Sequence, residues 1–536
     1  MSVKKMLKKV LLFNEDKNTY NFELTKPDIN YIQGYDENFK ISSYITKNKE
    51  YIKNRFKIPL NNDVILRNIT LSGERKAIVV FIEGMVSTNY VDLAVIKPLQ
   101  VIPKITDEVI YNTPEAALNK LISHGQARSS DDINDVVDEI NFGSCAVFID
   151  GIPLGFIMDV RGWEHRSIDK PENEQSIYGP QEAFAEMLRT NSALIRKTVL
   201  TEKLICEAVK IGKISKTRGV LMYIADTANP ELVNEVRQRI ESLDIDYVMA
   251  IEEVGMMLEE NSFMITTQIL ATERPDRTAR ALCDGRVALL LNGSPKALVF
   301  PTNGFELTHA ASDTYMKVPY ANMSRIIRLL AMLSSIFLPG FYLAITLFHQ
   351  EMIPTYLLYS ISAARENVPF PSILELLLMD FAFEMIREAG LRMPGIIGST
   401  LGIVGGLILG QAAVSAKIVS PLMIIVIAIT GIGSFATTDY SLSWTYRILR
   451  LIFILLGAFF GFYGIALGIF VYSTYLGAQK SFGVPFLSPL PDSGWRNILS
   501  TVFVKPIWKM ENRPDYLKAQ KEKRQPKISK KWRYKL

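Results

Sequence analysis

Residues 396–416 read IIGSTLGIVGGLILGQAAVSA and contain no Asp, Glu, Lys, Arg or His. A helix of about 20 apolar residues is long enough to cross the ~30 Å hydrocarbon layer of a bilayer. Three other stretches are equally free of charge: 329–348, 418–438 and 451–479. Four such runs are hard to place as buried helices of a soluble core. The last two-fifths of the chain is therefore predicted to lie in a membrane.

The last of these stretches, residues 451–479, has an unusual length. It is too short for two crossings of a bilayer and long for one, so we expect a single tilted or broken helix there. The sequence thus predicts an all-α transmembrane bundle of about four spans, with an amphipathic or re-entrant helical segment after the first span.

Two of the predicted spans carry glycines at intervals of four residues. These are Gly398, Gly402, Gly406 and Gly410 in the second span, and Gly457 and Gly461 in the last. Glycines at this spacing form a helix face without side chains, which lets another helix approach closely where lipid supplies no hydrophobic drive for association. We expect tight helix packing and assembly at these faces, either within one subunit or between subunits.

The segment after the first span contains a predicted helix at 372–389 in which acids recur every four residues. Asp380, Glu384 and Glu388 then form one stripe on a largely apolar helix. One interpretation is an interfacial helix with its acids in water. The other is a stripe that lines a pore or vestibule and concentrates cations.

The first 320 residues have the composition of a soluble α/β head. Asp150-Gly151 and Asn292-Gly293 each separate two apolar runs, which is the strongest short hairpin signal. AVFIDGIP at 146–153 and ALLLNGSP at 288–295 align without gaps, and the elements around them recur in the same order. We therefore expect two tandem subdomains, which either hold a ligand between them or form an assembly surface.

The predicted organisation has five parts: a flexible leader at 1–35, a first α/β subdomain at 36–165, a second at 166–320, the transmembrane domain at 321–480 and a basic tail at 481–536. The first ten residues contain four lysines and no apolar signal-peptide core. Three scattered cysteines and four histidines give no metal-ligand spacing. A cytoplasmic head with reduced, buried thiols is expected.

Lysine and arginine placement predicts the orientation of the bundle. From Arg496 to Leu536 there are 13 Lys/Arg against 3 Asp/Glu. Since positive charge favours the cytoplasmic side, head and tail are both expected there, although Arg447 and Arg450 count against this topology. The basic tail suits anionic membrane lipid, and we favour lipid over nucleic acid because no nucleic-acid-binding motif is present.

No phosphate loop, nucleophile elbow or metal box appears, so no catalytic residue, cofactor or metal is predicted. Two charged segments remain as candidates for a subdomain or subunit junction. The first is a predicted helix at 181–197 with Glu186, Arg189 and Arg196, and the second contains Arg274, Arg277 and Arg280. They either form structural ion pairs or capture an anionic ligand.

These segments also carry a family resemblance. GPQEAFAEMLRTNSALIR at 179–196 resembles the signature of the A subunits of GerA-type spore germination receptors. NEVR at 234–237, DGRV at 284–287 and the motif FGVP…LSP at 482–489 are similar to the same family. The resemblance extends from about residue 30 to residue 510.

The resemblance implies a receptor subunit in the inner membrane of the bacterial spore, beside a transporter-like B subunit and a lipoprotein C subunit. It implies nutrient sensing, with recognition mainly by the B subunit, and A subunits that oligomerise into a nutrient-gated cation channel. The alternative is a non-conducting scaffold that couples the transporter-like subunit to other germination machinery. An enzyme is not expected.

Overall fold

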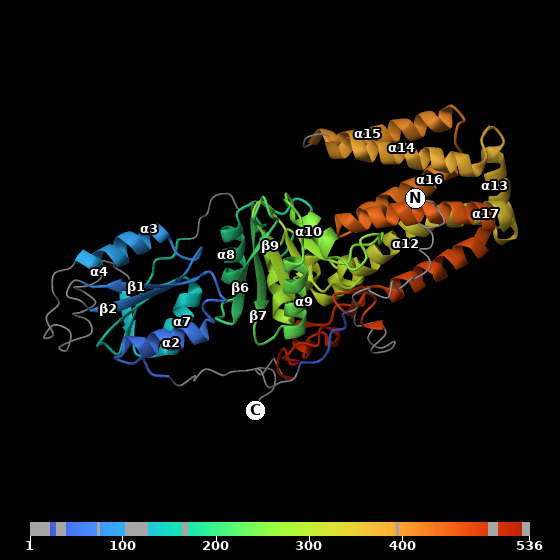
Figure 1. The fold of residues 1–536 in the computed structure, drawn as a ribbon. Coiled ribbons are helices and arrows are strands. Elements are labelled where there is room, and N and C mark those ends of the chain that lie inside the picture. The colour runs from blue at the N-terminus through green and yellow to red at the C-terminus, as the bar shows by residue number, and fades with distance from the viewer. Residues whose placement is uncertain are drawn as a thin grey trace, which may run out of the picture.

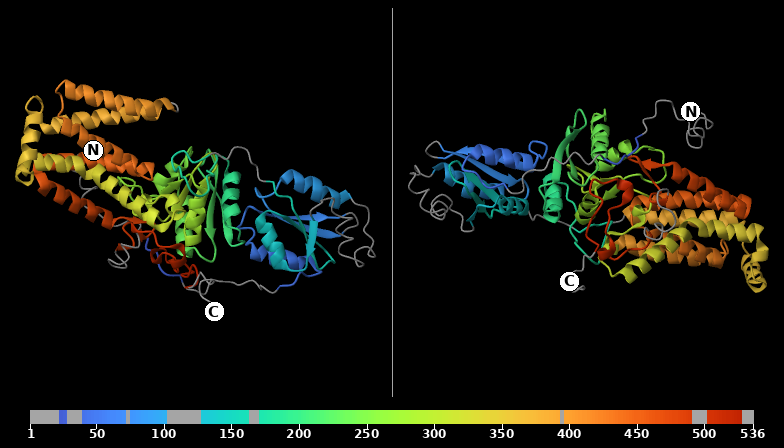
Figure 2. Two further views of the ribbon diagram at one scale, coloured as in Figure 1. Left: turned by 180° about the vertical axis from the view of Figure 1, so that it is seen from behind. Right: turned by 90° about the horizontal axis from the view of Figure 1, so that it is seen from below.

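The computed structural model describes residues 22–27, 39–71, 75–101, 127–162, 170–392, 396–490 and 502–527. Two α/β subdomains and a helical bundle follow one another along a single long axis (Figures 1 and 2). A helix start expected at Thr113 lies outside the described residues.

The first subdomain is a five-stranded antiparallel sheet in the order β1-β2-β4-β5-β3. The strands are β1 (Val64–Thr70), β2 (Lys76–Ile82), β3 (Ala127–Ser130), β4 (Cys145–Ile149) and β5 (Gly155–Met158). One face packs on α2 (Ile45–Arg55) and α7 (Ile133–Phe142). The other packs on a helical segment made of α3 (Thr88–Tyr90), η2 (Val91–Ile96) and α4 (Lys97–Val101). Central strands are covered on both faces, which explains their continuous apolar runs.

The second subdomain repeats this topology, with strand order β6-β7-β9-β10-β8. Its strands are β6 (Leu204–Ile211), β7 (Thr217–Ile224), β8 (Leu270–Thr272), β9 (Val287–Leu291) and β10 (Ala297–Phe300). α8 (Leu188–Thr198) and α11 (Pro275–Asp284) cover one face, and α9 (Pro230–Glu241) and α10 (Ile251–Leu258) the other. The predicted α/β head with a tandem repeat is therefore present.

The repeat extends to individual hydrogen bonds at the two hairpins. The Gly151 N–H donates to Ser43 O at 2.8 Å, and the Gly293 N–H donates to Glu186 O at 2.7 Å. Both glycines have positive φ, at 88° and 85°, as the tight turn requires. Each hairpin thus anchors the loop that leads into α2 or α8.

The bundle contains α12 (Val318–Phe348), α13 (Thr355–Arg365), α14 (Ser372–Arg392), α15 (Ile396–Ser415), α16 (Pro421–Phe435) and α17 (Tyr440–Ala478). Within the described residues, α12 and α17 are long and apolar enough to cross a membrane, and α16 is a shorter apolar helix. Two candidate spans are therefore found where about four were expected. α14 and α15 form a hairpin at the edge of the bundle (Figure 1), and α14 packs against α12, α16 and α17.

α17 is broken, which was one of the two forms expected for residues 451–479, and it is folded in two at the break. Gly461 has non-helical angles of φ 59° and ψ −143°. A Cβ on Gly464 would lie 2.5 Å from Leu456 O, so the second arm packs back against the first. Both arms end at the head, where the Thr438 hydroxyl donates to Leu307 O at 2.7 Å and the Gln268 amide donates to Gln479 Oε1 at 3.3 Å.

The described part of the basic tail packs on the second subdomain (Figures 1 and 2). Leu517 is buried, and the Gln520 amide donates to Ala228 O at 2.6 Å. Burial acts to raise the pKa of Asp226, but hydrogen bonds from Lys521 and Lys203 outweigh it and lower the pKa to about 2. The tail is thus held to the head by its lysines.

Residues 22–27 belong to the expected flexible leader, yet they also lie against the second subdomain. Leu24 is buried, and Thr25 O accepts a hydrogen bond from the Asn229 amide at 2.8 Å. Asn229 is the N-cap of α9. This segment therefore joins the start of the chain to the same surface that holds the tail.

Candidate functional site

The first charged segment joins the two subdomains. Arg196, in α8, is 2% exposed and forms an ion pair with Asp63 at the start of β1. Its Nη2 donates to Asp63 Oδ1 at 2.7 Å and to Asn61 Oδ1 at 3.0 Å. Arg189 forms an ion pair with Glu83 at 2.5 Å across the same junction. These contacts correspond to structural ion pairing between the subdomains.

Glu186 was expected to lie in the same helix as Arg189, within residues 181–197, but it does not. α8 begins at Leu188, so Glu186 lies in the preceding loop, where its carbonyl accepts the Gly293 bond. The predicted helix started seven residues too early because the Asn191 side chain binds this loop. Its Nδ2 donates to Ala185 O at 2.6 Å, and its Oδ1 accepts from Ala185 N at 2.8 Å.

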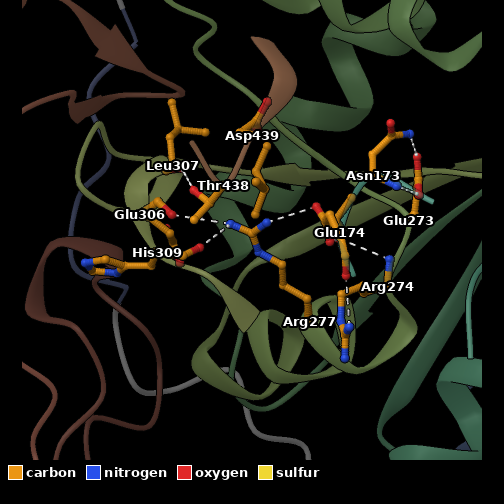
Figure 3. Close-up of polar contacts among 12 residues, drawn as sticks. Asn173, Glu174, Glu273, Arg274, Arg277, Glu306, Leu307, His309, Thr438 and Asp439 are labelled. Carbon is orange, nitrogen blue, oxygen red and sulfur yellow. Dashed lines mark hydrogen bonds and ion pairs between the residues drawn. The ribbon is translucent and has the colours of Figure 1, made fainter. Parts of the chain in front are cut away.

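The second charged segment lies at the junction of the head and the bundle (Figure 3). Arg277 Nη1 lies 3.0 Å from Glu174 Oε1. Arg277 Nη2 donates to the backbone oxygens of Glu306 and His309, at 3.3 Å each. Because Leu307 O in the same turn accepts from Thr438, this turn connects Arg277 to the loop between α16 and α17.

Glu174 is the central carboxylate of this junction. The Thr272 hydroxyl donates to its Oε2 at 2.7 Å. Burial raises the pKa of Glu174, while Arg277 and Thr272 act to lower it. The carboxylate thus depends on these two partners for its charge.

Arg274 and Arg280 occupy two different environments on α11 and its N-cap. Arg274 is fully buried and binds Asp276, with Nε–Oδ1 and Nη2–Oδ2 distances of 3.0 Å each. Its Nη2 also donates to Pro180 O at 2.7 Å, which fixes the segment between the subdomains. Arg280 is half-buried and makes no ion pair among the described residues, and burial lowers its pKa.

The acid stripe of α14 meets arginines of α17 inside the bundle. Arg450 is 1% exposed, and its Nη2 lies 3.0 Å from Asp380 Oδ1 and 2.6 Å from Glu384 Oε1. Arg447 and Arg387 each lie 3.5 Å from Glu384. We call these five residues the bundle charge cluster. Glu388, one helical turn further along α14, is exposed and lies outside the cluster.

Comparison with known proteins decides the family. The family described as Bacillus/Clostridium GerA spore germination protein matches residues 50–516. The chain belongs to the GerA family. The family resemblance predicted from the motifs of the head is confirmed.

Several GerA-family relatives are similar over most of their length. The chain is 37% identical to spore germination protein KA of Bacillus subtilis (strain 168), over 89% of this chain and 88% of that protein. It is 33% identical to spore germination protein GerLA of Bacillus cereus, over 87% and 94%. The uncharacterized membrane protein YfkQ of Bacillus subtilis (strain 168) is 34% identical, over 84% and 88%.

One solved structure also shows similarity to this chain. It is the crystal structure of the N-terminal domain of the A subunit of the Bacillus megaterium spore germinant receptor GerK3. The match has 25% sequence identity and a TM-score of 0.34, and covers 49% of this chain and 96% of that chain.

The predicted glycines of the GerA-family bundle have unequal environments. Gly457 packs closely against Gly340 O of α12, and Gly461 forms the break in α17. Gly410 makes an ordinary contact with Ile424, and Gly406 faces open space. The surroundings of Gly398 and Gly402 lie outside the described side chains.

Sequence reasoning missed Arg447 and Arg450 as partners of the acid stripe. It placed them outside the spans, because a span was defined by the absence of charge. A signal was nevertheless present: two arginines three residues apart precede the last apolar run, and two acids four residues apart lie on the preceding amphipathic helix. Opposite charges with helical spacing on two neighbouring helices can pair across a bundle.

Proposed function

We propose that this GerA-family chain is the A subunit of a nutrient-responsive germination receptor in the inner membrane of the spore. Several copies assemble around a cation path, with the transporter-like B subunit and the lipoprotein C subunit as partners. The bundle charge cluster is the observation that carries this proposal. Ionisable residues among apolar helices are expensive, and where they occur they mark ion pathways.

The bundle geometry supports a membrane position with head and tail on one side. Both arms of α17 end at the head, so residues before and after α17 share a side. The paired state of Arg447 and Arg450 also removes the charge argument against this topology, because an arginine neutralised inside the bundle says nothing about loop orientation. We propose that this side is the spore core.

In the described arrangement the cation path is closed. Asp380 and Glu384 both pair with Arg450, and Arg447 and Arg387 also lie beside Glu384, so neither carboxylate is free to attract a cation. Opening would separate α14 from the first arm of α17 and expose the two acids in a stripe. We propose that nutrient recognition in the complex favours this separation.

The α14–α15 hairpin supports assembly of several copies. Gly406 of α15 has no neighbour within 4 Å among the described residues, so the glycine face is uncovered at this position. A second helix can approach such a face closely. We propose that a neighbouring subunit covers it.

A non-conducting scaffold is the second candidate function. It is favoured by the same pairing, because acids that are always bound to arginine serve only to fix α14 to α17. In that case the head–bundle junction at Arg277 would transmit a change in the partner subunits without any ion crossing this chain.

Rubidium flux through proteoliposomes that contain the receptor complex separates the two candidates. Asp380→Asn combined with Glu384→Gln should change nutrient-triggered flux at least about tenfold while the complex still assembles. Glu351→Gln, an exposed acid in η5 (Gln350–Met352) outside the stripe, is the matched control. Unchanged flux in the double variant would remove the acids from the path and favour the scaffold.

A further inference from the structure

An apolar cavity lies where the bundle meets the head. It has a volume of about 360 Å³ and lies between α12, α16, both arms of α17 and the 304–309 turn. Its walls include Met332, Ile336, Leu449, Leu476 and Phe486. This volume and apolar lining are those of a small-molecule site.

The hydroxyl group of Tyr446 faces the cavity without a hydrogen-bond partner among the described residues. The Tyr446 side chain is 6% exposed, and its hydroxyl is open to the cavity rather than enclosed by protein. The neighbouring Tyr472 hydroxyl is satisfied, because it lies 3.1 Å from Thr266 Oγ1. Since buried hydroxyl groups normally find a partner, the Tyr446 hydroxyl points to an occupant that carries an acceptor.

The cavity is basic at one end. Arg325 and Arg328 of α12 line it, and both pair with the fully buried Asp313, at 2.9 Å from Arg325 Nε and 2.5 Å from Arg328 Nη2. Two arginines and one carboxylate leave a net charge of +1. Arg328 Nε is buried without a hydrogen-bond partner within the described chain.

A second, polar cavity of about 250 Å³ adjoins the first and shares Arg328 and Thr438 with it. Asn173, Ser176 and Arg277 contribute to its walls. An apolar chamber and a polar chamber that meet at an arginine match the two halves of an amphiphile.

We propose that the paired cavities bind one molecule of an anionic glycerophospholipid. An acyl chain fills the apolar cavity, and the phosphate lies at Arg325 and Arg328, whose planar guanidinium groups suit phosphate oxygens. The Tyr446 hydroxyl donates to an ester carbonyl. Basic pockets between membrane helices are used in this way for lipid headgroups. The inference rests on the proposed membrane position of the bundle.

Such a lipid would connect the parts that must move in the proposed function. The cavity touches α12, both arms of α17 and the 304–309 turn, and the same turn receives the Arg277 hydrogen bonds. An occupant therefore stabilises the described arrangement of bundle and head over arrangements that open the cavity.

Lipid retention by the full chain in detergent, measured by native mass spectrometry, tests the site. Wild-type protein should retain dioleoyl phosphatidylglycerol one to one, and Met332→Trp should weaken retention about tenfold by filling the cavity. Leu330→Trp, on the same helix but 57% exposed, should behave as wild type. Dioleoyl phosphatidylcholine should bind several-fold more weakly, and inorganic phosphate alone should not bind.

Tyr446→Phe keeps the inference open to refutation if Met332→Trp does not fold. It removes the hydroxyl without changing the cavity and should weaken phosphatidylglycerol retention about fivefold. Equal retention by wild type, Met332→Trp and Tyr446→Phe, or equal binding of the two lipids, would overturn the proposal. The assay needs no ion flux, so wild-type protein that retains no phosphatidylglycerol but still shows nutrient-triggered flux in the receptor complex would refute the lipid site and leave the proposed function standing.

Discussion

Two buried arginine–carboxylate clusters, one in the head and one in the bundle, differ in how completely their hydrogen bonds are made. In the head, Nε and Nη2 of Arg196 donate to Asp63, and Nη2 also reaches Asn61 Oδ1 and Leu204 O. A buried ion pair is stable only when such additional hydrogen bonds satisfy its remaining polar atoms. The junction of the two subdomains is therefore a fixed contact.

The bundle charge cluster is less complete. The Nε atoms of Arg387, Arg447 and Arg450 are buried and make no hydrogen bond within the described chain. The cluster also contains three arginines for two acids, so it holds an excess positive charge. Unsatisfied buried polar atoms raise the free energy of one arrangement relative to others. The bundle charge cluster is therefore better able to rearrange than the junction between the two subdomains.

The largest expected effect comes from removing Arg196 from its buried contact with Asp63 in the head. Arg196→Met should lower the free energy of unfolding by about 3–5 kcal/mol, because Asp63 is left as an uncompensated buried charge. Thermal unfolding of the purified full chain measures the loss. Arg189→Gln is the control: Arg189 is 59% exposed, so its pair with Glu83 should contribute less than about 1 kcal/mol. Equal losses in both variants would mean that burial does not distinguish the two pairs.

The bundle side should respond in function as well as in stability. Arg450→Gln should cost about 2–3 kcal/mol, less than Arg196→Met, because Arg447 and Arg387 remain beside Glu384. It should also raise the rubidium leak measured without nutrient, since Asp380 and Glu384 lose their shared partner. Arg196→Met serves as the control for stability loss alone. A leak of wild-type size in Arg450→Gln would argue against the closed-path interpretation.

The parts of this fold that the sequence predicted are those decided by local chemistry. The hairpins at Asp150-Gly151 and Asn292-Gly293 and the long buried strands were found where expected, because turn residues and apolar runs act over a few residues. The edge strands β3 and β8 were missed, because they have four and three residues and β3 is polar. Nothing in so short a stretch distinguishes a strand from a loop.

A broken helix was one of the two forms expected at 451–479, but the position of the break and the bundle charge cluster could not be predicted, because both depend on contacts between distant parts of the bundle. The arm before Gly461 includes Arg447 and Arg450, which hydropathy excludes from a span until their partners on α14 are known. When the residues of that arm are included, α17 consists of two helices, one before and one after Gly461. The sequence thus predicted a membrane bundle. The path of the chain within the bundle could not be predicted without knowing that Arg447 and Arg450 pair with the acids of α14.

A third prediction compares the same substitution at two glycines. Gly457→Leu should destabilise the subunit by about 1–3 kcal/mol, because its side chain would enter the backbone of α12 at Gly340. Gly406→Leu should leave subunit stability unchanged and abolish the proposed oligomer, since Gly406 faces open space among the described residues of one chain and is proposed to face a neighbouring subunit. Unfolding curves and the oligomeric state in detergent measure the two effects. An intact oligomer in Gly406→Leu would place the subunit interface elsewhere.

The smallest expected effect concerns the tail. Its ion pair with the head, between Lys521 and Asp226, is partly exposed, unlike the buried clusters compared above. The pKa of Asp226 is about 2 in the folded chain, below the ordinary value of 3.8, so its carboxylate stabilises the folded state above about pH 4. This stabilisation is lost as the pH falls through 2, and it should amount to only about 1–2 kcal/mol because Lys521 is partly exposed. Release of the tail should appear as faster proteolysis after Lys521 between pH 4 and pH 2, measured with an acid protease. Asp226→Asn should remove the pH dependence and show fast cleavage throughout that range.

If wild type and Asp226→Asn are cleaved equally slowly at pH 4, the buried Leu517 and the Gln520 hydrogen bonds hold the tail without the lysines.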